Sequence, residues 1–248
     1  MRLIRYVLAL LPLLLLLVIT TSSRGSKRAV VSTTDFTASL TANKVAHAAA
    51  TEAAELYSSW HLAESGLSQD AFEKAIIGYN NFEEKRMLHN ERMLTIIDYS
   101  QPSSQKRLYV LDMTSGEIVF NTLVAHGRNS GLEYASDFSN INSSLKTSLG
   151  FYITMGTYMG GNGYSMKLMG CEKGINDNAY ERAIVFHGAD YVSNNFVRSN
   201  GYLGRSYGCP AVSIADNKKI IDRIKNGSCM FLYHPTKKYI ERSRILNS

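Results

Sequence analysis

Two stretches near the C-terminal end decide how this sequence is interpreted: Ala183-Ile184-Val185-Phe186-His187-Gly188 and Gly204-Arg205-Ser206-Tyr207-Gly208-Cys209-Pro210-Ala211-Val212. The four apolar residues of the first stretch predict a buried strand, at whose end His187 emerges. Cys209 follows 22 positions later (209 − 187), between small residues. Reactive groups are often held by such a rigid scaffold. The pair therefore predicts a thiol nucleophile and a histidine base.

The chemistry of an amide-attacking thiol explains the residues around Cys209. A thiol attacks only as the thiolate, and a free cysteine titrates near about 8.5, so it needs an activating neighbour such as His187. Gly208 lets a substrate approach the thiol closely. The backbone N–H groups of Tyr207, Gly208 and Cys209 are the predicted oxyanion hole, which stabilises the negative charge that develops on the attacked carbonyl.

Other interpretations of the same residues find less support in the sequence. His187 could be a satisfied polar residue at a strand end, with Cys209 a buried small side chain. A papain-like protease is disfavoured, because it places the cysteine before the histidine. A metal site is disfavoured because His-x-His, His-Glu-x-x-His and Cys-x-x-Cys spacings are absent, so we expect no metal and no cofactor. The side chains considered as metal ligands are His126, His187, His234, Asp190 and Cys209.

The motif Ser206-x-Gly208-Cys209, preceded by His187-Gly188, resembles the murein L,D-transpeptidase catalytic domain family, the YkuD-like L,D-transpeptidases. The resemblance covers roughly residues 65 to 234. The commoner family pattern has His where this chain has Tyr207, and Asn or Arg where it has Ala211, whereas a narrower branch shares the aromatic residue and Pro-Ala. The other matching stretches are Leu123-Val124-Ala125-His126-Gly127, Asn129-Ser130-Gly131, Ser148-Leu149-Gly150-Phe151-Tyr152, Glu172-Lys173-Gly174 and Asn176-Asp177-Asn178.

This resemblance implies a mixed β-sandwich and assigns roles to the site residues. Cys209 and His187 would be catalytic, and the main-chain carbonyl of Gly188 would fix the histidine tautomer, with Asp190 as the rival for that role. Loop structure is an equally good explanation for the residues proposed to contact substrate carboxylate and amide groups. Those predicted contacts are Asn129, Ser130, Tyr191, Arg205 and Ser206.

The resemblance also implies a function. The protein would be an exported cysteine acyltransferase whose partners are peptidoglycan stem peptides. The thiol would attack the carbonyl of the L-centre of a diamino acid and expel a terminal D-amino acid. An amine of a second stem peptide would resolve the thioester as an L,D-transpeptidase, and water would resolve it as an L,D-carboxypeptidase. The alternative is a non-catalytic envelope protein that binds murein with the same fold.

Composition limits the remaining function classes. The chain has 248 residues, 45% of them hydrophobic, with a formal charge of +6. This length suits one domain with an extension. No dense Lys/Arg run lies between Val30 and Ile214, so we expect no nucleic-acid partner.

The N-terminus has the pattern of a targeting segment. Arg2 and Arg5 precede an apolar run from Tyr6 to Ile19, and small residues follow it. We therefore predict a signal peptide or N-terminal anchor over residues 1–23, and a linker over residues 24–45. The protein would be exported to the periplasm or cell envelope, with a possible membrane anchor if the segment stays uncleaved.

The rest of the chain predicts a helical extension over residues 46–92 and a catalytic domain over residues 93–248. Many strands and few helices give a β-rich α+β class. Helices are predicted over residues 45–65, from an N-cap at Ser68, and from Ser213 to Asn226. Strands are predicted over residues 94–98, 107–112, 118–124, 151–154, 165–169, 183–186 and 229–233.

Three cysteines, an odd number, leave at least one thiol unpaired, or paired between molecules, if the chain is exported. With Cys209 as the reactive thiol, Cys171 and Cys229 could form a disulfide. Burial of both as small apolar side chains is favoured, because Cys229 opens the apolar run Cys229-Met230-Phe231-Leu232-Tyr233.

Overall fold

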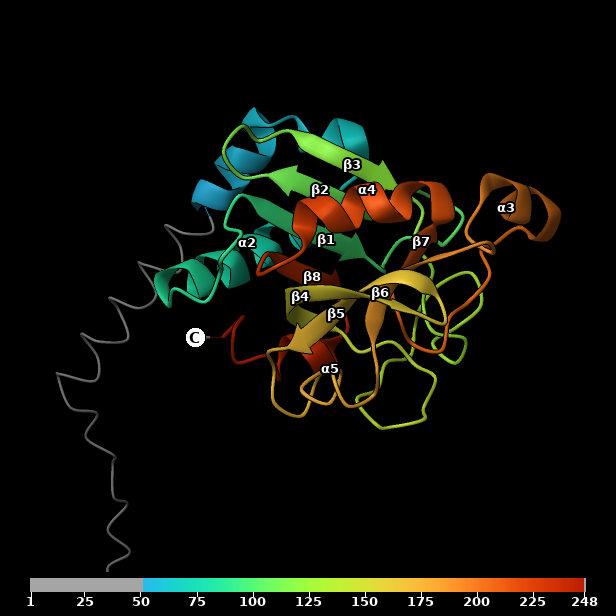
Figure 1. The fold of residues 1–248 in the computed structure, drawn as a ribbon. Coiled ribbons are helices and arrows are strands. Elements are labelled where there is room, and N and C mark those ends of the chain that lie inside the picture. The colour runs from blue at the N-terminus through green and yellow to red at the C-terminus, as the bar shows by residue number, and fades with distance from the viewer. Residues whose placement is uncertain (1–50, 248) are drawn as a thin grey trace, which may run out of the picture. The chain divides into compact units, whose positions relative to one another are not determined.

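A single mixed sheet of eight strands forms the centre of the computed structural model, which describes residues 51–247 (Figure 1). The strand order is β3-β2-β1-β8-β4-β5-β6-β7. This confirms the predicted β-rich α+β class with a mixed sheet. The strands are β1 (Met93–Asp98), β2 (Leu108–Asp112), β3 (Ile118–Thr122), β4 (Gly150–Gly160), β5 (Gly163–Gly170), β6 (Val185–Ala189), β7 (Ala211–Ser213) and β8 (Cys229–Tyr233).

The sheet curls until its two edges approach each other. Strand β1 pairs with β8 in parallel and β6 pairs with β7 in parallel, whereas the other neighbours are antiparallel. Strands β3 and β7 lie at opposite ends of the strand order. However, the segment after β3 bridges to β7 at Ala125 and Ala211, and Gly127 bridges to Ser206. One continuous, almost closed sheet therefore replaces two separate layers.

The N-terminal helices are part of the same core as the sheet. Residues 51–59 are helical, a 3-10 turn spans Leu62–Ser65, and α2 spans Gln69–Glu84. As predicted, the Ser68 side chain caps α2 by accepting from the Ala71 N–H. Helix α2 packs against β1 and β8.

Aromatic packing connects α2 to the middle of the sheet. Phe151 on β4 is paired with Phe231 on β8, and their rings stack with centroids 4.1 Å apart. Phe82 of α2 meets the Phe151 ring edge-on at 5.9 Å. Gly78 makes this approach possible, since a Cβ there would lie 2.0 Å from the Phe151 ring.

Helix α4 (Ile214–Ile224) covers part of the sheet beside β6 and β7. As predicted, Ser213 caps it, and Ile220, Ile221 and Ile224 are fully buried. Helix α3 (Asn194–Asn200) was not predicted from the sequence. It has no buried residue and lies to one side of the sheet (Figure 1). The short α5 (Lys237–Ile240) was not predicted either.

Strand boundaries differ from the predictions at the place that matters for the site. Strand β6 begins at Val185 rather than at Ala183, because Ala183 has a left-handed backbone with φ 53°. His187 therefore lies in the middle of β6 instead of at its end. Strand β7 was not predicted, because an apolar pattern of only three residues is too short to indicate a strand.

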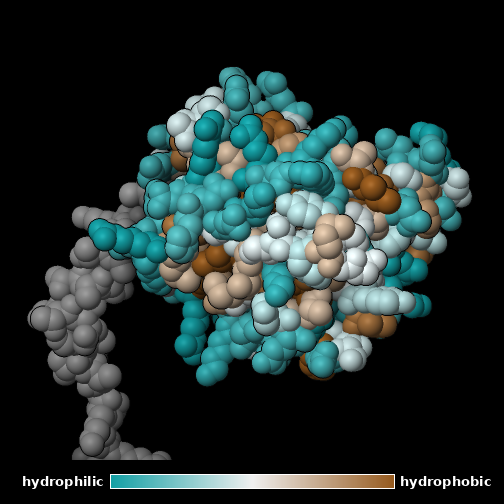
Figure 2. Space-filling model, viewed as in Figure 1, coloured by the Kyte–Doolittle hydropathy of each residue, from teal (hydrophilic) through white to brown (hydrophobic). Residues whose placement is uncertain are grey.

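Cys171 and Cys229 are free thiols, and Cys229 is fully buried, which agrees with the favoured interpretation. The predicted signal segment (1–23) and linker (24–45) lie outside the described residues. Between residues 51 and 247, no helix is long and apolar enough to cross a membrane. Figure 2 shows one face of the molecule as mostly hydrophilic, with hydrophobic residues in small separate patches.

Replacement of Phe151 by Ala should lower the free energy of unfolding by about 3–5 kcal/mol, because it removes the ring between Phe82 and Phe231 and leaves a cavity. Chemical denaturation measures this loss. Met159→Ala is the control, since Met159 is 76% exposed and should change stability by less than about 0.5 kcal/mol. Equal effects of the two variants would contradict the described core.

Candidate active site

The parallel register of β6 and β7 brings His187 and Cys209 together. His187 is paired with Ala211, two residues after Cys209. Adjacent strands lie about 4.8 Å apart, so Cys209 is level with Val185, two residues before the histidine. The Val185 N–H donates to Cys209 Sγ at 3.4 Å, which confirms that placement. His187 and Cys209 thus lie on neighbouring backbone segments, offset from each other by two residues.

His187 is held in one tautomer by its own neighbour. Its Nδ1 lies 2.9 Å from the Gly188 carbonyl oxygen. Because a carbonyl only accepts, Nδ1 carries the proton and Nε2 keeps a free lone pair in the neutral ring. Burial lowers the pKa of His187, and the bond to Gly188 opposes that effect. Asp190, the rival partner, is exposed and makes no hydrogen bond to His187 within residues 51–247.

The Cys209 thiol sits in a nearly closed environment and is 9% exposed. Its sulfur donates to the Ala183 carbonyl at 3.8 Å as well as accepting from Val185. Burial raises the thiol pKa, while the Val185 N–H and the Arg182 guanidinium oppose this rise. Both directions, a raised thiol pKa and a lowered imidazole pKa, favour a neutral pair at rest. The left-handed backbone of Ala183 costs about 1–2 kcal/mol and places its carbonyl at the sulfur.

The turn before Cys209 corrects part of the predicted oxyanion hole. Ser206 Oγ donates to the Cys209 carbonyl at 2.6 Å and accepts from the Gly208 N–H at 3.1 Å. The Gly208 N–H is thus used inside the fold. The N–H groups of Tyr207 and Cys209 have no hydrogen-bond acceptor in the described part of the chain. Gly208 has φ +124°, and a Cβ there would lie 2.8 Å from the Lys146 carbonyl oxygen, so only glycine fits this turn.

Cys209 and His187 line a cleft of about 730 Å³. Three arginines line it and no carboxylate does, so its field suits an anionic substrate. Tyr207 stands at its edge, 69% exposed, with the Arg128 guanidinium 5.9 Å from its ring centroid. The lining residues are Arg128, Asn162, Arg182, Ala183, Ile184, His187, Tyr191, Phe196, Tyr202, Gly204, Arg205, Ser206, Tyr207 and Cys209.

Three of the five predicted substrate contacts lie in the cleft, namely Tyr191, Arg205 and Ser206. The structure does not support the other two. Ser130 is fully buried, and its hydroxyl accepts from the Thr147 N–H at 2.9 Å. The Asn129 side chain donates to the Ser144 carbonyl at 3.0 Å. Both residues shape the loop between β3 and β4, because its polar backbone groups need partners.

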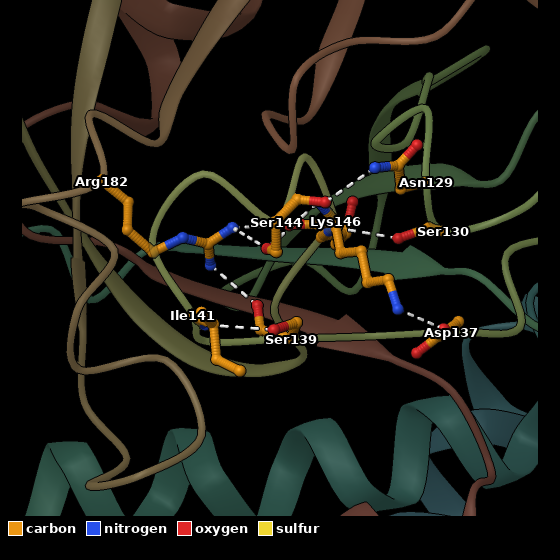
Figure 3. Close-up of polar contacts among 9 residues, drawn as sticks. Asn129, Ser130, Asp137, Ser139, Ile141, Ser144, Lys146 and Arg182 are labelled. Carbon is orange, nitrogen blue, oxygen red and sulfur yellow. Dashed lines mark hydrogen bonds and ion pairs between the residues drawn. The ribbon is translucent and has the colours of Figure 1, made fainter.

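Arg182 is a site residue that sequence reasoning missed. Figure 3 shows its guanidinium reaching the loop that contains Ser139 and Ser144. It donates to the Ser139 carbonyl at 2.8 Å and to the Lys146 carbonyl at 2.7 Å. Lys146 in turn packs under Gly208. Arg182 thereby ties this loop to the Cys209 turn, and nothing in the local sequence signals such a contact.

His126, from another matching stretch, is structural. It is fully buried, and Arg107 donates to its Nδ1 at 2.8 Å. Burial, with the nearby Arg107 charge, lowers the pKa of His126 to about 3, so the ring stays neutral. Across residues 51–247, no group of three or more His, Cys, Asp or Glu side chains is arranged to hold a metal ion.

The sequence match identifies the family. A family model described as the L,D-transpeptidase catalytic domain matches residues 63–233, more than half of the chain. The chain belongs to the L,D-transpeptidase catalytic domain family. This confirms the predicted family. The match begins inside the predicted helical extension. Comparison with curated proteins gives no match.

Solved structures of L,D-transpeptidases have low sequence identity to this chain. One from Mycobacterium smegmatis is 13% identical with a TM-score of 0.37, over 58% of this chain and 59% of that one. One from Mycobacterium tuberculosis H37Rv is 12% identical with a TM-score of 0.37, over 58% of each chain. One from Stackebrandtia nassauensis is 14% identical with a TM-score of 0.35, over 67% of this chain and 68% of that one. This chain thus spans less than two thirds of the two mycobacterial structures, and the family assignment rests on the sequence match.

Alkylation of Cys209 by iodoacetamide should rise with pH through a midpoint above the usual value for a free cysteine, about 8.5. Only the thiolate reacts, and a raised thiol pKa moves thiolate formation to higher pH. Mass spectrometry of the Cys209 peptide at a series of pH values measures the midpoint, with Cys209→Ala as the control. A midpoint near pH 6 would instead indicate a preformed thiolate–imidazolium pair and contradict a neutral resting site.

Proposed function

We propose that this protein is an exported cysteine acyltransferase that forms or trims links between peptidoglycan stem peptides, with Cys209 as nucleophile and His187 as base. The observation that carries the proposal is the β6–β7 register. It puts the Cys209 backbone level with Val185, two residues from His187, and both side chains line the same cleft. The Nδ1 of His187 is bound to the Gly188 carbonyl, so Nε2 is the proposed proton acceptor. The family match supports the same reaction class.

The first half-reaction forms a thioester. Cys209 Sγ attacks the carbonyl carbon at the L-centre of a diamino acid, and its proton passes to His187 Nε2. The carbon–nitrogen bond then breaks, and the histidine gives that proton to the departing amine of the terminal D-amino acid. A neutral thiol beside a neutral imidazole is a suitable resting state, because the proton moves only as the sulfur attacks.

The second half-reaction resolves the thioester. An amine of a second stem peptide gives up a proton to His187 and attacks the thioester carbonyl. A new amide bond forms, the carbon–sulfur bond breaks, and the thiol regains a proton from the imidazolium. When water attacks instead, the product is a shortened stem peptide and the outcome is L,D-carboxypeptidase action.

The free backbone donors suit the charge that develops in both half-reactions. The Tyr207 and Cys209 N–H groups are the proposed oxyanion donors, because the Gly208 N–H is already bonded to Ser206. One such donor is worth roughly 2.7–4 kcal/mol of barrier in a studied hydrolase. The bonds of Ser206 to the Gly208 N–H and to the Cys209 carbonyl preorganise this turn.

The charge of the cleft suits a donor peptide with a free carboxyl end. Arg182 is committed to loop carbonyls, so Arg128 and Arg205 are the better candidates for the carboxylate of the departing D-amino acid. Arg205 is oriented by its bonds to the Arg128 and Gly131 carbonyls, at 3.3 and 3.2 Å. Arginine favours such contacts because its planar guanidinium pairs with both carboxylate oxygens.

Cys209→Ala and Cys209→Ser should abolish release of the terminal D-amino acid from a tetrapeptide donor, because neither side chain supplies a thiolate. His187→Ala should slow release about a hundredfold or more, the usual loss when a general base is removed. Chromatography of the released amino acid and of the cross-linked or shortened peptide measures both effects.

Cys171→Ala is the matched control, since Cys171 is a half-buried free thiol outside the cleft and its replacement should leave the rate unchanged. Circular dichroism of each variant checks that the fold is retained. Activity that survives in folded Cys209→Ala would refute the mechanism and favour a non-catalytic, murein-binding role.

A further inference from the structure

Lys167 on β5 is held between two exposed tyrosines beside the site. Its Nζ lies 5.8 Å from the Tyr158 ring centroid and 5.4 Å from the Tyr180 ring centroid. The ammonium also donates to the Tyr180 hydroxyl at 3.4 Å. The rings are 38% and 53% exposed. Two aromatic contacts restrict a side chain that is otherwise among the most mobile in proteins.

Sheet register places this cluster on the same face as the catalytic pair. Lys167 is opposite Val185, whose N–H binds Cys209 Sγ. Ser165, two residues before Lys167, is opposite both His187 and Tyr158. Directly opposite residues point to the same side of a sheet, as do residues two apart. The side chains of Lys167, His187 and Tyr158 therefore share one face.

Residues close in sequence to the cluster line the cleft. Asn162, in the turn between β4 and β5, lines the cleft, and so does Arg182, which follows Tyr180 by two residues. Arg128 comes from the segment that bridges to Ser206, away from β5, and Arg205 belongs to the turn segment that leads into Cys209. A carboxylate could therefore be bound on each side of the thiol, by the arginines on one side and by Lys167 on the other.

Lys167 carries a charge that the protein does not neutralise. Within residues 51–247 it has no carboxylate within ion-pair distance, whereas Lys218, which also lies over a tyrosine ring, is paired with Asp222. A half-buried, oriented ammonium without a counter-ion attracts an anion from solution. Both tyrosine rings contact the ammonium of Lys167. A ligand at this place therefore meets a positive charge, which favours a carboxylate over a sugar ring.

We propose that Lys167, positioned by Tyr158 and Tyr180, binds a carboxylate on the side chain of the donor residue whose carbonyl Cys209 attacks. The inference rests on the proposed function. The arginines hold the terminal carboxylate, and Lys167 selects donors whose third residue carries a second carboxylate, such as diaminopimelate, over donors with lysine at that position.

One experiment tests the charge without requiring any acyl transfer. The Cys209 thiol is alkylated with iodoacetate, which is an anion, and with iodoacetamide, which is its neutral analogue. The quantity compared is the rate with iodoacetate divided by the rate with iodoacetamide. In Lys167→Gln this ratio should fall about threefold, which is within the range of a solvent-screened ion pair. Lys167→Arg should keep most of the ratio, and Lys218→Gln should leave it unchanged. An unchanged ratio in Lys167→Gln would overturn the proposal.

A second experiment tests the assignment to the side chain of the donor. Two tetrapeptides that differ only in diaminopimelate or lysine at the third residue are compared by kcat/KM for thioester formation. The unmodified protein should prefer the diaminopimelate donor, and Lys167→Gln should lose roughly tenfold on that donor alone, as expected for a charge-assisted hydrogen bond.

Equal losses on both donors would overturn the side-chain assignment, and so would the absence of any preference in the unmodified protein. If neither donor acylates Cys209, the proposed function fails, while the alkylation ratio still decides whether Lys167 attracts carboxylates at the thiol. The alkylation experiment can therefore refute the role of Lys167 independently of the proposed function.

Discussion

Parallel pairing of β6 with β7 is the constraint on which the site depends. Three residue pairs, starting at His187 and Ala211, hold the histidine strand beside the turn that ends in Cys209. The edges of the sheet then reinforce this ladder, because the segment after β3 bridges to the same short strand at Ala211. A strand of three residues forms few hydrogen bonds of its own. Here β7 is paired with β6 on one side and bridged to Ala125 on the other, and α4 follows it directly.

The environment of the thiol suits both a stable fold and the proposed chemistry. Burial disfavours charge on Cys209 and on His187, so folding does not have to bury an ion pair. The thiol is instead satisfied by the Val185 N–H and the Ala183 carbonyl. Arg182 connects this region to the β3–β4 loop, which supports the glycine turn from below. Rigid support of this kind keeps the two free N–H groups in place for the proposed oxyanion.

Much of the fold and the central pair could be predicted from the sequence. The Ser68 cap, the buried face of α4 and most strands follow from local patterns, and the His187 and Cys209 motif resembles a known family. The Ser130 and Asn129 contacts could not be judged locally, because each depends on a backbone partner 17 or 15 residues away. The Gly208 N–H is bonded to the nearby Ser206 hydroxyl, whose orientation is known only from the folded turn. The same holds for Arg182 and Lys167, whose importance appears only when the strand register and the loop contacts are known.

The most direct measurement of the central claim is the mass of the protein trapped during turnover of a tetrapeptide donor, followed by peptide mapping of the adduct. The structure predicts an increase equal to the donor minus its terminal D-amino acid, located on the peptide that contains Cys209, and a much slower appearance of this adduct in His187→Ala. An adduct on Cys171 or Cys229, or an adduct that forms equally fast without His187, would contradict the account.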